Sequence, residues 1–143
     1  MYTYMEDALD YLTDYASKHH IKIMWASLSP ITPPGSNFEY RSVVMNSNWH
    51  NPKEFIFQLA HEISHVIHGD KGDIYYYHAC YTGKESVEYK ANVGAVKLLV
   101  PFFCQETDKE NVSSTNFMAA FRVPEYLTDI VKRELTKFYD KQQ

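Results

Sequence analysis

The stretch that decides the fold is Phe55-Ile56-Phe57-Gln58-Leu59-Ala60-His61-Glu62-Ile63-Ser64-His65-Val66-Ile67-His68. Its apolar side chains recur at helical spacing, with Phe55, Leu59 and Ile63 on one side, so it predicts an amphipathic helix. The preceding residues 51–54 offer an asparagine N-cap, a proline at the first helical position and a glutamate three residues after the cap. Gly69 is the residue type that most often ends a helix, so we expect this helix to end there.

The predicted helix carries the pattern H-E-x-x-H at His61, Glu62 and His65. His61 and His65 are four residues apart and share one face, where two imidazoles can bind a single metal ion. Glu62 is turned by about 100° around the helix axis, so it can reach a water molecule held by the ion. The pattern predicts metal-assisted hydrolysis with Zn²⁺ as the ion and Glu62 as the catalytic residue. The alternative is an amphipathic helix whose histidines bind no metal.

Composition places the chain among globular proteins. It has 143 residues, of which 45% are hydrophobic and 22% charged, and we expect one domain over residues 1–143. It contains no apolar run long enough to span a membrane, and its polar, acidic start does not resemble a signal peptide. Two cysteines, Cys80 and Cys104, are too few for a disulfide framework, which suits the cytoplasm. With a net charge of −4 and scattered basic residues, direct nucleic-acid binding is not expected.

The other segments predict an α+β fold with a small, mostly antiparallel sheet. Helices are expected at 3–19 and 85–100, the second ended by Pro101, and a C-terminal helical pair at 113–121 and 124–139, within residues 113–141, is expected to pack on the domain. Strands are expected at 21–28, 38–41 and 42–46, with a proline-rich loop at 29–36. We assign 42–46 to an edge where an extended peptide could add as a further strand, although an ordinary internal strand is the alternative.

A catalytic zinc site needs a third protein ligand besides His61 and His65. The candidates are Glu88, Glu85, His68, His78, Asp70 and Asp73. A straight helix cannot bring His68 round to the same ion as the two motif histidines. Glu88 is favoured because a carboxylate on a separate helix can approach the ion from the opposite side. Asn92, one turn later, can accept a hydrogen bond from a ligand imidazole and fix its tautomer.

A hydrolytic site of this kind also needs a donor for the oxyanion of the tetrahedral intermediate. The segment that follows the motif helix is rich in phenols and holds one imidazole. Its candidates are Tyr75, Tyr76, Tyr77, His78 and Tyr81, and packing of these aromatic rings against the core is the alternative.

The order of these motifs resembles the ImmA/IrrE family of zinc metallopeptidases. The resemblance rests on residues 43–46, on 55–65 with the H-E-x-x-H pattern, and on 88–101, which follow Glu-x-x-Ala-Asn-x-x-Ala-x-x-Leu-Leu-x-Pro; residues 117–135 resemble the closing helices. The pairing of the motif with Glu-x-x-x-Asn is similar to the gluzincin arrangement, which has Asp in the last position. Other departures are Ser64 where Gly is common, Lys90 where many members have a second Glu, and Gly94 in place of Phe.

The resemblance implies a cytoplasmic bacterial protein, encoded on a phage or mobile element, that uses Zn²⁺ to cleave a helix-turn-helix transcriptional repressor. It also implies His61, His65 and Glu88 as metal ligands, with Asn92 behind them. The alternative function is that of a non-cleaving regulatory protein with a structural metal, which acts on a repressor by contact alone.

Overall fold

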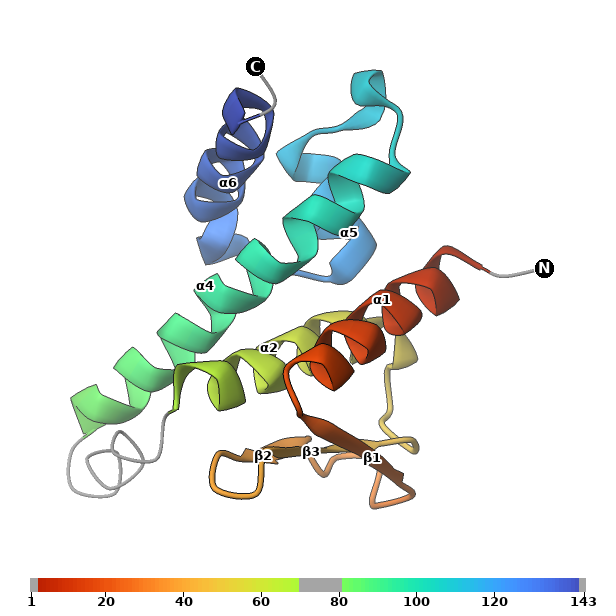
Figure 1. Cartoon of the computed structure of the whole chain (residues 1–143), viewed down its shortest axis with the longest axis vertical. Coiled ribbons are helices and arrows are strands. Elements are labelled where there is room, and N and C mark those ends of the chain that lie inside the picture. Colours follow the sequence, from red (N-terminus) through yellow and green to blue (C-terminus); the bar gives the residue numbers. More distant parts are fainter. Residues whose placement is uncertain (1–2, 70–80, 142–143) are drawn as a thin grey trace.

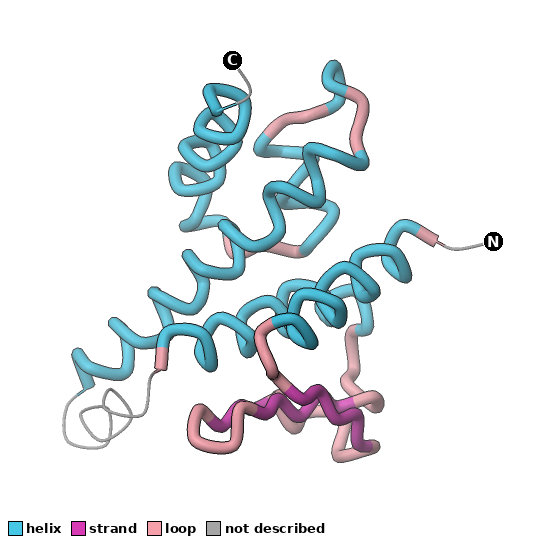
Figure 2. The backbone as a smooth tube through the Cα atoms, in the orientation of Figure 1, coloured by secondary structure: helices cyan, strands magenta, loops and turns pink. Residues whose placement is uncertain are grey.

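The computed structural model describes residues 3–69 and 81–141 of the chain (Figure 1). Its longer helices and its strands are α1 (Tyr4–Lys18), β1 (Lys22–Ala26), β2 (Gly35–Asn37), β3 (Ser42–Asn46), α2 (Phe55–His68), α4 (Tyr81–Glu106), α5 (Ser114–Phe121) and α6 (Thr128–Lys141). Short 3-10 turns lie at Pro52–Glu54, Lys109–Asn111 and Glu125–Leu127. The predicted α+β class is confirmed, with the strands gathered at one end of a largely helical molecule (Figure 2). Within the described residues, none of the helices has the length and apolarity needed to cross a membrane.

The sheet has three strands in the order β1-β3-β2 and is mixed rather than mostly antiparallel. β1 and β3 pair in parallel from Lys22 opposite Ser42, whereas β2 pairs with β3 antiparallel. The expected edge position of residues 42–46 is wrong, because β3 is the central strand and has neighbours on both sides. The physical reason is the connection between β1 and β3. It is long enough for β3 to run parallel to β1, and it contains β2, which pairs with the other edge of β3.

The expected strand at 38–41 is also wrong, since these residues form a turn. The Asn37 side chain accepts a hydrogen bond from the Tyr40 amide at 3.0 Å, and Arg41 takes a left-handed φ of 44° just before β3. An asparagine that bonds to backbone ahead of it favours a turn over an extended strand. The extended segment lies earlier, at β2, which overlaps the end of the loop expected at 29–36.

Helix α2 forms over the predicted stretch and is capped by Gly69, which has a left-handed φ of 67°, but it begins at Phe55 rather than directly after Asn51. Asn51 accepts a hydrogen bond from the Lys53 amide at 3.3 Å and starts the 3-10 turn that leads into α2. The Glu54 side chain accepts from the Trp49 indole at 2.8 Å, so its carboxylate anchors the preceding loop. One side of α2 packs against the sheet and α1, and α4 packs across its opposite side (Figure 1).

Helix α4 runs through Pro101 to Glu106, so the predicted end at Pro101 is wrong. An interior proline costs about 3 kcal/mol through a lost hydrogen bond and a clash with the preceding turn. Phe102 and Phe103, directly after it, are buried, and each side chain contributes about 1.5–3 kcal/mol on burial. The Tyr11 hydroxyl also donates to the Leu98 carbonyl at 2.7 Å, beside the carbonyl that the proline leaves without its helical donor. Packing therefore outweighs the proline.

The buried apolar core is continuous from the sheet to the C-terminal helices. Its largest fully buried side chains include Phe117, Phe121, Leu12, Met45, Leu59, Ile63, Leu99 and Leu127. α6 packs against α4, and the Phe117 ring of α5 meets the Phe103 ring of α4 edge to face at 5.3 Å. The 3-10 turn Glu125–Leu127, which stands where the sequence predicts the start of the last helix, is held in place by buried Leu127. The core thus fixes the position of this turn relative to α4.

Candidate metal centre

The crossing of α2 and α4 brings two imidazoles and one carboxylate together. His61 Nε2 and His65 Nε2 are 3.0 Å apart. One Glu88 oxygen lies 3.3 Å from His61 Nε2 and the other 2.8 Å from His65 Nε2. These three residues are a group whose ligand atoms all lie within 4.8 Å of one another. Residues expected from sequence to share an ion are therefore side by side in space.

The donor set fits a zinc ion. Ligands about 2.0–2.1 Å from a tetrahedral Zn²⁺ lie about 3.3 Å from one another. The shortest separations between the three side chains are 3.0, 3.3 and 2.8 Å, close to that value. Two histidines and one glutamate are also a ligand set of catalytic zinc sites, which keep the fourth position open. The cluster therefore has the chemistry and the size of a three-ligand zinc site.

The tautomer of His61 is also suited to a metal. The Asn92 side-chain oxygen lies 2.7 Å from His61 Nδ1. Because an amide oxygen can only accept, His61 Nδ1 carries a hydrogen, so the neutral ring would offer the lone pair of Nε2 to an ion. Helix α4 supplies both groups, since Glu88 and Asn92 are one turn apart on the same face.

Glu62 lies buried beside the cluster, with 8% of its surface exposed and its carboxylate 4.0 Å from His61 Nε2. Burial raises the pKa of the Glu62 carboxyl, and the two nearby imidazoles and a hydrogen bond with the Ser36 side chain oppose that rise. Ser36 belongs to edge strand β2, so the sheet edge and the metal cluster meet at Glu62. A buried carboxylate at this distance would be suited to exchange a proton with a water molecule if the three side chains held an ion.

Glu88 differs from the two histidines in its exposure. Its side chain is 49% exposed, whereas those of His61 and His65 are each 13% exposed. Hydrogen bonds with the two imidazoles hold the pKa of the Glu88 carboxyl well below its usual range. The carboxylate is therefore charged at neutral pH and ready to bind a cation.

Sequence reasoning missed Tyr126. Its hydroxyl oxygen accepts a hydrogen bond from the Asn92 amide nitrogen at 2.5 Å, and its ring stacks on that of Tyr89 at 6.5 Å. The region around it was expected to serve only for packing, and no pattern links it to the motif helix. Its place at the site follows from the way the Glu125–Leu127 turn returns to α4.

Two departures from the family pattern, Ser64 and Gly94, face each other where α2 and α4 cross. A β-carbon at Gly94 would overlap the Ser64 hydroxyl oxygen and would lie 3.0 Å from both Ser64 Cβ and His68 Cε1. The Ser64 hydroxyl thus occupies the place that a β-carbon of residue 94 would take, and Gly94 also lines a cavity of about 260 Å³. The contact allows the close approach that places Glu88 beside the histidines.

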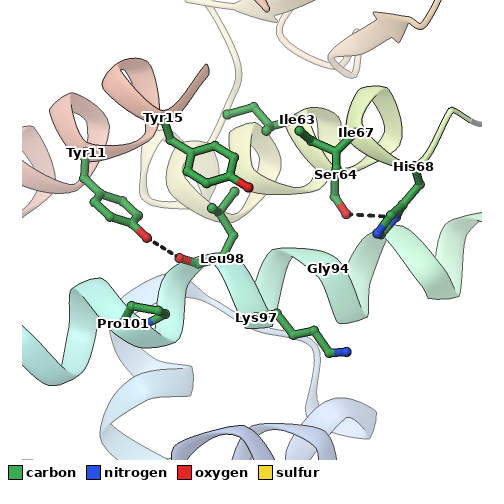
Figure 3. Close-up of a pocket in the computed structure, with 10 residues that line it drawn as sticks. All are labelled: Tyr11, Tyr15, Ile63, Ser64, Ile67, His68, Gly94, Lys97, Leu98 and Pro101. Carbon is green, nitrogen blue, oxygen red and sulfur yellow. Dashed lines mark hydrogen bonds between the residues drawn. The ribbon is translucent and has the colours of Figure 1, made fainter. Parts of the chain in front are cut away.

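His68 lies away from the three-ligand group and borders a separate cavity of about 260 Å³ (Figure 3). Its Nδ1 is 3.4 Å from the Ser64 hydroxyl, and Tyr11, Tyr15 and Lys97 also line the cavity. The other sequence candidates, Asp70, Asp73, His78 and Tyr75–Tyr77, lie outside the described residues, and the side chains of Tyr81 and Glu85 are not described either.

Comparison with known proteins gives a match over most of the chain. The family model of Peptidase M78, described as the IrrE N-terminal-like domain, matches residues 16–129 and so includes α2, α4 and all the residues of the cluster. No curated protein and no solved structure matches significantly. Since the family model covers well over half of the chain, this protein belongs to the IrrE N-terminal-like family of peptidases, a metallopeptidase family.

Proposed function

We propose that this protein is a zinc-dependent endopeptidase. The observation that carries the proposal is the convergence of His61, His65 and Glu88 within 4.8 Å, with the Glu62 carboxylate 4.0 Å from His61 Nε2. Those three side chains hold the ion, and Asn92 orients His61 behind it. When bound, zinc lowers the pKa of water towards about 7 and polarises a carbonyl group.

Glu62 carries the proton transfers in this proposal. Its carboxylate accepts a proton from the attacking water and later returns it to the amine of the leaving peptide. Burial raises the pKa of the Glu62 carboxyl, which makes its carboxylate a better proton acceptor than an exposed one.

The substrate is proposed to bind as an extended strand along β2. This strand is at the edge of the sheet, and its central residue Ser36 contacts Glu62, so a peptide paired with β2 would pass beside the proton-transferring carboxylate. Pairing with an open sheet edge provides backbone hydrogen bonds that do not depend on the sequence of the peptide. Family membership supports the finer proposal that the substrate is a helix-turn-helix repressor of a phage or mobile element.

The test is co-expression of the protein with a helix-turn-helix repressor from the same genome, followed by detection of repressor fragments. The intact protein should produce fragments that disappear when a chelator is added to the purified reaction. Glu62→Gln should retain zinc, measured by elemental analysis, and lose cleavage. Glu110→Gln, at an exposed carboxylate in a distant 3-10 turn, is the matched control and should cleave normally.

Full cleavage by zinc-loaded Glu62→Gln would contradict the proposed mechanism. Relief of repression by that variant without fragments would instead identify a protein that acts by contact.

A further inference from the structure

An asparagine behind a metal-binding histidine has an orientation that must be fixed. An aspartate presents two equivalent oxygens, but the Asn92 amide has an accepting end and a donating end. With Oδ1 towards His61 Nδ1, the ring keeps its hydrogen on Nδ1 and leaves Nε2 free for the ion. A flipped amide would place a donor against Nδ1 and favour the tautomer with hydrogen on Nε2, which cannot bind metal.

Tyr126 contacts the donating end of the Asn92 amide. Its hydroxyl oxygen lies 2.5 Å from Asn92 Nδ2, on the side of the amide away from His61. In the flipped orientation the amide oxygen would face the phenol oxygen, and the phenol hydrogen would have to turn from solvent towards Asn92. The chain of contacts therefore runs from Tyr126 to Asn92 to His61, with separations of 2.5 and 2.7 Å.

The Tyr126 side chain is presented by a well-anchored turn. Leu127, next in sequence, is fully buried in the core, and the Thr128 hydroxyl donates to the Glu125 carbonyl at 2.6 Å. The phenol itself is 64% exposed and stacks on Tyr89 of α4. A residue this exposed contributes little to the core, so the contact with Asn92 is the distinctive feature of its environment.

We propose that Tyr126 is a positioning residue of the metal centre, which holds the Asn92 amide in the orientation that sets the metal-binding tautomer of His61. The inference rests on the proposed metal-binding role of His61. In this arrangement a residue near the C-terminus acts, through Asn92, on the orientation of a histidine on α2. It also explains how an asparagine serves at a position where the gluzincin pattern has an aspartate.

The decisive experiment measures zinc affinity by competition with a chromophoric chelator in a double-mutant cycle. Loss of a group that orients a metal ligand typically weakens metal binding by about 10–100-fold. Tyr126→Phe should therefore weaken zinc binding by about 10-fold where residue 92 is the natural asparagine. In the Asn92→Asp background the same change should weaken binding by less than about 3-fold, because either carboxylate oxygen can accept from His61.

Tyr89→Phe is the matched control, since it removes the hydroxyl of the stacked neighbour, and it should keep zinc affinity. Equal weakening by Tyr126→Phe in both backgrounds, or no weakening in either, would overturn the inference. So would an equal effect of Tyr89→Phe. Thermal unfolding without metal should be the same for Tyr126→Phe and the parent protein, because the ring and its stacking remain.

A second measurement separates this inference from the proposed function. Imidazole ¹⁵N spectra of the metal-free protein at neutral pH should show His61 with hydrogen on Nδ1, and Tyr126→Phe should give a mixture of tautomers. An unchanged tautomer would refute the role of Tyr126. Failure to cleave any repressor, with zinc affinity and tautomer behaving as expected, would refute only the peptidase proposal.

Discussion

Substitution of Gly94 by alanine tests how closely α2 and α4 must approach to form the metal cluster. The added methyl would overlap the Ser64 hydroxyl and press on Ser64 Cβ and the His68 ring at 3.0 Å. Overpacking of this kind costs about 1–3 kcal/mol, and the gain in helix propensity returns about 1 kcal/mol. We expect a net loss of up to about 2 kcal/mol, or up to about 8 °C in Tm for a chain of this size.

The size of the loss should depend on residue 64. Ser64→Ala removes the overlapping oxygen but leaves Cβ at 3.0 Å, so Gly94→Ala should cost less in that background. Ser64→Gly also removes Cβ, leaving only the movable His68 ring, so Gly94→Ala should cost least when measured against the Ser64→Gly single variant. Urea unfolding of the single and double variants measures these differences. Gly35→Ala is the control, because no atom lies within 4 Å of its added methyl.

The same series should affect metal binding. Separation of the helices moves Glu88 away from the histidines, so Gly94→Ala should also weaken zinc affinity, and Ser64→Gly should restore it. If Gly94→Ala were as stable and as tight a zinc binder as the parent protein, the proposed role of this contact would be wrong.

Three further outcomes are expected. Zinc at 100 times its Kd should stabilise the protein by about 2.7 kcal/mol, measured as a rise in Tm. His61→Ala should abolish this rise, whereas the control His50→Ala, at an exposed position, should keep it. Phe117→Ala, at a fully buried ring packed on Phe103 and Phe121, should lower the free energy of unfolding by about 3–5 kcal/mol in urea titrations. Burial raises the pKa of Tyr4 to about 12. The unfolded chain therefore loses this proton first, stability should fall from about pH 10 towards 12, and Tyr4→Phe should reduce that fall.

Helix α2 was predictable because one short stretch contains everything that specifies it. The apolar spacing gives its buried side, Asn51 and Pro52 mark the 3-10 turn that leads into it, and Gly69 marks its end. The spacing of His61 and His65 then requires them to share a face. The structure brings Glu88 to them, although the metal-binding roles of all three remain predictions.

Other features depend on contacts between distant parts of the chain. The central position of β3 depends on the path of residues 27–41, which the alternation of apolar and polar residues along a strand does not specify. The extension of α4 past Pro101 depends on the burial of Phe102 and Phe103, and the contact of Tyr126 with Asn92 depends on how the last turn packs on α4. Predictions from local sequence fail at these places because tertiary packing contributes more free energy than the intrinsic preference of the residues for helix, strand or turn.

The unequal exposure of the three proposed ligands has a kinetic consequence. The histidines are enclosed on a packed helix, whereas half of the Glu88 side chain faces solvent. Metal exchange should therefore proceed through departure of one carboxylate, with the imidazoles retaining the ion until a competing ligand arrives from the solvent side. Replacement of Glu88 by the shorter Asp should therefore accelerate the dissociation of zinc. A small chelator should also extract the ion faster than a bulky one.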